Sequence, residues 1–265
     1  MRNRLFSLLI LAALGIASSA SAQQGNVLNP IVQTGFLIGP IGGINLVAYN
    51  TDAFPILNSE ASCFTAQNGS DIAPWGGLTF EYPLGNSTEL QNFIVVEALY
   101  DSKSSKFTSQ NGSTTTPTKK NNVEADGSVT TSLDAQLAYL LINLDYKYNF
   151  TPGPSPVGPG FQVGPSIGIR MTSTLNKTVT VSASSGDPNN PVATATVTSP
   201  SAVPSASGIR LSLRAGVTYD IPFTQEWIAT PTVGYDFPIT KVNTTYNWRA
   251  SAVFAGIAFR YFVRG

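Results

Sequence analysis

The sequence contains no histidine. Histidine is the side chain whose unperturbed pKa lies closest to neutrality, so general-base activation of a serine or of water most often depends on it. It is also a principal zinc ligand, and the single thiol, Cys63, cannot build a zinc site alone. We therefore expect no catalytic residues, no metal site and no cofactor.

Cysteine and charged residues are also scarce. One cysteine excludes an intramolecular disulfide framework. Only 11% of the residues are charged, and the 15 basic residues balance the 15 acidic ones, so nucleic acid is not expected as a partner. Few Glu, Lys and Arg beside 42% hydrophobic residues argue against surface helices and against disorder.

The first 22 residues have the pattern of a secretory signal peptide. Arg2 and Arg4 precede an apolar stretch at 5–17, and small residues at 20–22 form a cleavage site. The alternative is a membrane anchor, but 13 apolar residues are too few to span a bilayer as a helix. We expect residues 1–22 to be removed on export and residues 23–265 to form one domain.

Apolar residues recur with period two, and no later segment sustains a helical period. Eight such segments are predicted as strands, at 42–50, 75–84, 90–102, 129–150, 160–172, 207–221, 226–240 and 246–263. A tilted transmembrane strand needs about 9 to 11 residues, more than an ordinary strand. Most of the eight are long enough to span a membrane.

The connections alternate between short and long. Long loops at 51–74, 103–127 and 173–206 are predicted at one end, as in outer-membrane barrels with brief periplasmic turns and longer external loops. Within the third, segments 178–184 and 192–198 read as a hairpin that continues two strands beyond the membrane. We expect the proline-containing stretch 199–207 to interrupt its returning arm.

Each predicted strand has one apolar and one polar face. In the stretch GIRLSLRAGVTYDI, Leu211 and Leu213 lie opposite Arg210 and Arg214. A soluble barrel would bury the leucines, but the other face combines small residues with nearly balanced charges, as a crowded lumen requires. The predicted lumen charge network comprises Glu81, Glu97, Asp145, Lys147, Arg170, Arg210, Arg214, Asp220, Asp236 and Arg260.

Aromatic residues collect near the strand ends, as in the girdles at membrane interfaces. The predicted lipid-interface aromatics on the short-turn side are Tyr82, Tyr146, Tyr148, Tyr219, Trp227, Tyr261 and Phe262. A second band is predicted toward the long loops at Trp75, Tyr100, Phe237 and Trp248. The fold expected is all-β: a closed, antiparallel, up-and-down transmembrane β-barrel of eight strands, with ten as the alternative.

The last predicted strand, SAVFAGIAFRYFV, carries Gly256 followed by aromatics at Phe259 and Tyr261. It is similar to the C-terminal signal of small bacterial outer-membrane β-barrels, and the chain resembles the superfamily of the OmpA membrane domain, OmpX, OmpW and PorT-like proteins. Phe254, where a polar residue is usual, and the ending Val263-Arg264-Gly265 depart from that signal. The resemblance implies an outer-membrane location, with membrane lipid and the barrel assembly machinery as partners.

Two functions remain open at this point. One is a barrel with a charge-plugged lumen and long external loops, at 51–74, 103–127 and 173–206, in a structural or surface-interaction role with an extracellular ligand. The alternative is a narrow, porin-like conduit for small or apolar solutes. An enzyme is not expected, since the enzymes known among such barrels rely on histidine.

Overall fold

The computed structural model describes residues 35–50, 54–55, 65–66, 69–84, 90–110, 126–153, 156–184, 193–203, 205–243 and 247–264. The expected signal peptide at 1–22 and Cys63 lie outside these ranges. Twelve strands are present: β1 (Gly35–Asn50), β2 (Phe54–Pro55), β3 (Thr65–Ala66), β4 (Gly69–Leu84), β5 (Asn92–Ser102), β6 (Ser105–Gln110), β7 (Asp126–Asn149), β8 (Gly158–Ser184), β9 (Ala193–Ala202), β10 (Ile209–Pro222), β11 (Trp227–Pro238) and β12 (Arg249–Arg264). Among the described residues, no helix has the length and apolar character needed to cross a membrane.

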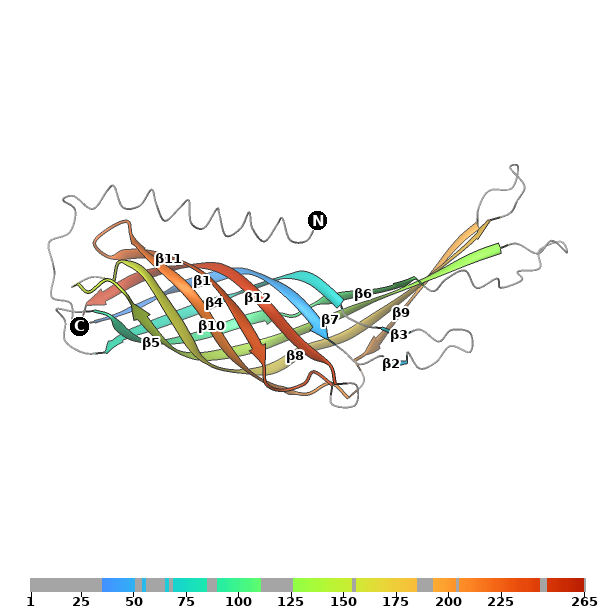
Figure 1. Ribbon diagram of the computed structural model, residues 1–265, viewed down its shortest axis with the longest axis horizontal. Helices are drawn as coiled ribbons and strands as arrows, with labels where there is room; N and C mark the ends of the chain where they lie inside the picture. The colour runs from blue at the N-terminus through green and yellow to red at the C-terminus, as the bar shows by residue number, and fades with distance from the viewer. Residues whose placement is uncertain are drawn as a thin grey trace. The chain divides into compact units, whose positions relative to one another are not determined.

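Eight of these strands close a ring, each antiparallel to its two neighbours (Figure 1). The order around the ring is β1, β4, β5, β7, β8, β10, β11 and β12, and β12 pairs with β1 along its length, from Gly35 opposite Arg264 to Asn50 opposite Arg249. Ring neighbours follow one another along the chain, so the fold is the predicted up-and-down barrel. A closed ring leaves no unpaired edge, which hydrocarbon requires.

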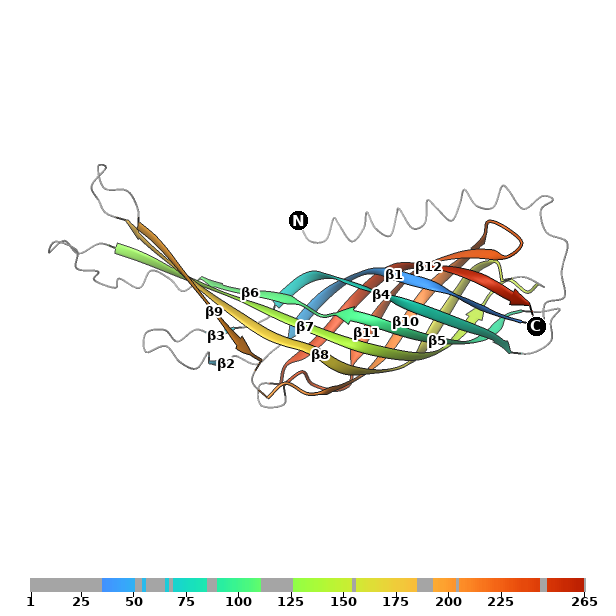
Figure 2. The ribbon, with the colours of Figure 1, turned by 180° about the vertical axis from the view of Figure 1, so that it is seen from behind.

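Four strands continue past one end of the ring as a small external sheet (Figures 1 and 2). Here β6 pairs with β7 from Ser105 opposite Ala135 outward, β7 and β8 stay paired as far as Asp126 and Ser184, and β9 pairs with β8. This end, the loop side, faces the cell exterior by the rule that outer-membrane barrels have short periplasmic turns. The opposite end, the turn side, holds the connections from β4 to β5, β7 to β8 and β10 to β11.

The long loops are therefore more structured than predicted. Segment 103–127 contains β6, and β4 begins at Gly69, inside the predicted loop 51–74. The predicted hairpin is present, with Thr178 opposite Thr198 and Ala183 opposite Ala193. The break expected at 199–207 is wrong for residues 199–202: Pro200 pairs with Asn176 inside β9, because β9 is an edge strand on which a missing N–H can face away from the ladder.

Three prolines interrupt the ring's ladders. Pairing of β7 with β8 passes from Asn143–Ser166 to Tyr146–Val163, skipping Pro165. The β10–β11 ladder likewise skips Pro231, and the β1–β12 ladder skips Pro40. Proline lacks the N–H that a ladder bond needs, so each gap has a local cause. The inward residues beside these gaps include Asp145, Asp220 and Arg260, so polar lumen side chains stand where ladder bonds are missing.

Candidate functional site

The barrel interior is where the chain concentrates its charge. Along β10 the side chains of Arg210 and Arg214 are only 3% and 5% exposed, whereas Leu211 and Leu213 are 37% and 41% exposed. The predicted orientation of the faces is confirmed. Among the described residues, eleven charged side chains are buried in this interior, and they form three clusters along the barrel.

The turn-side cluster consists of Glu81, Lys147, Asp220 and Arg260. Lys147 Nζ lies 2.7 Å from Asp220 Oδ2 and 3.2 Å from Glu81 Oε1, while Arg260 contacts Glu81 and donates to Asp220 Oδ1 at 2.5 Å. Thr230 and Asn149 also donate to Asp220, at 2.6 and 2.9 Å. Two acids thus face two bases, with neutral donors satisfying further carboxylate lone pairs.

The loop-side cluster consists of Asp101, Lys103, Arg210 and Asp236. Lys103 Nζ bridges Asp101 and Asp236 at 3.0 and 3.2 Å, and Arg210 donates to Asp236 at 2.8 Å. Asn45 donates to Asp101 at 2.6 Å. This cluster also balances two acids with two bases.

The middle cluster consists of Glu97, Asp145 and Arg214, and it is one base short. Arg214 lies 3.6 Å from Glu97, and its guanidinium carbon is 4.1 Å from the centre of the Phe254 ring. Asp145 has no ion pair with any described residue; Gln162 donates to it at 3.4 Å, and its Oδ1 has no hydrogen-bond partner among the described atoms. Acidic groups therefore outnumber basic groups at this height.

Buried apolar side chains also lie in the lumen between and beyond these clusters, which the prediction of one polar face for each strand did not anticipate. On the turn side, Phe93 and Phe262 belong to a buried group with Leu37, Leu90, Val95 and Ile228. In the middle, Trp75 and Phe254 pack with Ile41, Leu99, Leu141 and Ala258. Trp75 lies against Gly256, where an added Cβ would approach the indole to 2.4 Å, so the glycine makes room for the ring.

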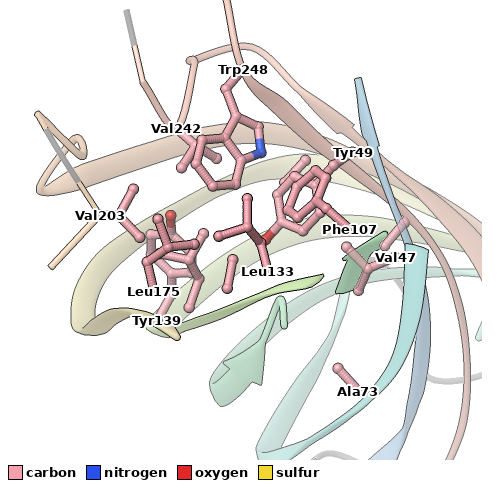
Figure 3. Packing of buried hydrophobic residues seen from close by; sticks show 14 residues of the cluster. Val47, Tyr49, Ala73, Phe107, Leu133, Tyr139, Leu175, Val203, Val242 and Trp248 are labelled. Atoms are coloured by element: carbon pink, nitrogen blue, oxygen red, sulfur yellow. The ribbon is translucent and has the colours of Figure 1, made fainter. Parts of the chain in front are cut away.

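The loop-side mouth of the barrel is covered by the largest apolar group (Figure 3). Trp248 packs edge-on against Tyr49 and Phe107, with ring centroids 5.3 and 5.6 Å apart. Val203 and Val242 reach this group from the connections outside the strands. The external connections thus contribute apolar side chains to the group at the loop-side end of the lumen.

Nine of the ten residues predicted for the lumen network are buried in the interior, and one is not. Arg170 is half-buried near the loop side, donates to the Ala206 carbonyl and forms no ion pair among the described residues. Asp101 and Lys103 were missed. Both share the alternation of Glu97, but ending the predicted strand at 102 assigned Lys103 to a loop.

Of the predicted lipid-interface aromatics on the turn side, six face the outer wall and one faces the lumen. Tyr82, Tyr146 and Trp227 are exposed on the outer wall, and Tyr148, Tyr219 and Tyr261 are partly so. Placing Phe262 at the lipid interface is wrong, because it follows Tyr261 directly and alternation turns it inward, where it is 3% exposed. In the second band, Tyr100 and Phe237 face outward, but Trp75 and Trp248 are lumen residues.

Several solved structures resemble this chain at low similarity. Ail, the attachment invasion locus protein of Yersinia pestis, gives a TM-score of 0.31 at 8% identity over 86% of this chain and all of its own. Neisserial surface protein A gives a TM-score of 0.31 at 16% identity, over 87% of this chain and 98% of its own. The N-terminal β-barrel domain of Pseudomonas aeruginosa OprF gives a TM-score of 0.24 at 12% identity, over 84% of this chain and 98% of its own. Scores this low support no further argument. No curated protein matches the chain.

The family comparison is decisive because it covers most of the sequence. The family model for the outer membrane protein beta-barrel domain matches residues 21–243. With the eight-stranded ring and its apolar outer wall, this match locates the protein in the outer membrane. The chain belongs to the outer membrane protein beta-barrel domain family.

Proposed function

We propose that this protein is a sealed outer-membrane barrel whose function lies in its external strands and loops, in a structural or surface-interaction role. The observation behind the proposal is a contrast along the barrel axis. Within the ring, side chains fill the lumen, and past the ring four strands project as a sheet. A filled lumen favours a role outside the barrel over transport through it.

The ion pairs that cross the lumen support the proposal that side chains block it. Lys147 of β7 joins Glu81 of β4 to Asp220 of β10, and Arg260 of β12 contacts both acids. Removing one partner of a buried ion pair costs about 3 to 5 kcal/mol, so displacing this cluster to admit a solute would be expensive. The apolar groups at both ends of the lumen add a second barrier to ions and water.

The outer edge of β9 supports a surface role. Among the described residues, β9 pairs with β8 alone, so the backbone groups on its other side have no strand partner. No charged residue occurs in the sequence between Asp187 and Arg210, although charges are a common protection of free edges. An extended segment of an extracellular partner can add to such an edge as a further strand. The loops at 51–74, 103–127 and 173–206 would supply side-chain contacts.

The last strand, β12, also supports an inference about assembly. Its sequence resembles the signal by which such barrels are recognised, and Gly256 and Tyr261 lie in a strand that closes the ring. We infer that the barrel assembly machinery recognises β12.

The test uses cells that display either the full chain or a variant lacking the outer arms of β8 and β9. Residues 178–198 are replaced by Asn-Gly, because Lys177 and Ser199 are paired and a two-residue turn can join them. We expect attachment to other cells and to matrix-coated surfaces to fall, while the barrel stays heat-modifiable on gels. Unchanged attachment in the variant would contradict the role of the external sheet.

A further inference from the structure

A polar pocket of about 260 Å³ lies on the outer wall of the barrel, separate from the lumen clusters. Strands β4 to β8 line it, with Asp71, Tyr100, Lys106, Asp134, Gln136 and Thr172 among its side chains. Tyr100 is 50% exposed, and the Lys106 side chain is 66% exposed, so the pocket opens outward.

Two irregularities of the strands flank this hollow. Residues 103–104 separate β5 from β6, and at the β7–β8 ladder Ala138 pairs with Thr172 but Tyr139 pairs with Arg170, which leaves Met171 as an extra residue. A bulge of this kind bends a strand and redirects side chains, and bulges are frequent beside functional sites. The pocket therefore lies where the backbone departs from a regular ladder.

The pocket lies at the outer boundary of the apolar belt. Tyr100 and Leu140 are cross-strand partners, and Leu140 and Met171 are exposed on the outer wall. Beyond them the outward positions of β5, of the residues that follow it and of β7 become polar: Ser102 and Ser104 after Tyr100, and Gln136 and Asp134 beyond Ala138. Because this is the loop side, the change from apolar to polar marks the headgroup level of the outer leaflet.

The charges in the pocket disfavour a phosphate. Lys106 lies 3.7 Å from Asp71 and is the cross-strand partner of Asp134, so two acids surround the single base. Neutral hydroxyl groups suit the pocket better. They can donate to the carboxylates and to the Gln136 carbonyl, and accept from Lys106, the amide and the serine and threonine hydroxyls. Tyr100 adds an amphipathic ring at the rim, against which the C–H face of a sugar can lie.

We propose that this pocket binds a sugar ring in the headgroup of an outer-leaflet glycolipid. Its acyl chains would lie along the exposed apolar wall below, beside Leu140 and Met171, while one sugar sits in the pocket. The lipid anchor places the sugar at the height where the pocket opens, so binding costs less entropy than it would for a free sugar.

The experiment measures binding of lipopolysaccharide with a complete core, which carries neutral hexoses, to the full protein, purified from outer membranes in detergent, by native mass spectrometry. We expect Tyr100→Ala and Gln136→Ala each to weaken binding about tenfold. Two matched variants outside the pocket should bind as the unmodified protein does: Tyr82→Ala, a tyrosine of similar exposure at the opposite interface, and Gln225→Ala in a turn-side connection. Heat-modifiability on a gel confirms that each variant is folded.

Three results would overturn the proposal. Equal weakening by Tyr82→Ala or Gln225→Ala would mean that the glycolipid binds without using the pocket. Loss of binding in EDTA would identify a divalent-cation site at Asp71 and Asp134 instead. Binding of free core oligosaccharide as tight as that of the glycolipid would mean that the ligand is a soluble sugar.

Discussion

The turn-side and middle clusters differ in how completely their charges are matched. On the turn side, Asp220 receives hydrogen bonds from Lys147, Arg260, Thr230 and Asn149. In the middle, Asp145 receives one long bond from Gln162 and has no ion pair with a described residue. The two aspartates are equally buried, at 0% and 1% exposure, so burial alone does not separate them.

The difference shows that acids and bases are matched within the turn-side cluster and not within the middle one. A buried charge contributes little or costs free energy unless ion pairs and hydrogen bonds satisfy it on the spot. Equal totals of acids and bases over the whole barrel would not give each buried charge a partner within contact distance. We therefore expect substitutions of equivalent aspartates to have unequal effects, and the following variants test this contrast.

The largest effect is expected for Asp220→Asn. The substitution leaves Lys147 and Arg260 with one carboxylate, Glu81, between them. Because two buried cations then share a single acid, the free energy of unfolding should fall by about 3 to 5 kcal/mol. Urea unfolding of the barrel in detergent, followed by tryptophan fluorescence, measures the change. A loss below about 1 kcal/mol would mean that solvent already reaches the cluster.

A smaller loss is expected for Arg214→Met, about 2 to 3 kcal/mol, because it removes the only base of the middle cluster but keeps an apolar chain against Phe254. Adding Glu97→Gln should restore part of that loss, since the acid that Arg214 pairs with then carries no charge. The double-mutant cycle in the same unfolding assay measures the coupling. Additive effects of the two substitutions would contradict a pairing between Arg214 and Glu97.

The smallest effect is expected for Asp145→Asn. No described base loses a partner, and an amide can replace the carboxyl group beside Gln162. Unfolding free energy should change by less than about 1 kcal/mol, or increase slightly. If Asp145→Asn instead matched Asp220→Asn, the middle cluster would hold a compensating charge, and the contrast between the clusters would fail.

Much of this architecture could be predicted from alternation alone. Arg210 and Leu211 sit on opposite faces because a strand allows nothing else, and nine lumen residues were identified from that rule. Phe262 was predicted at the lipid interface because aromatic residues were grouped by their place near strand ends, without regard to the face that each occupies. Lys103 was excluded because the predicted strand ended at residue 102. Which acid meets which base could not be predicted, because Lys147 of β7 reaches Asp220 of β10 across the lumen. Such contacts depend on barrel tilt and stagger, which one sequence does not encode in any local pattern.

The proposed sealing of the lumen is tested most directly by current across a planar lipid bilayer containing the purified, folded protein. We expect no stepwise conductance for the unmodified protein at physiological salt, because ionic and apolar layers fill the barrel from the turn side to the loop side. Regular, reproducible current steps from the folded protein would contradict a sealed lumen and favour a narrow channel.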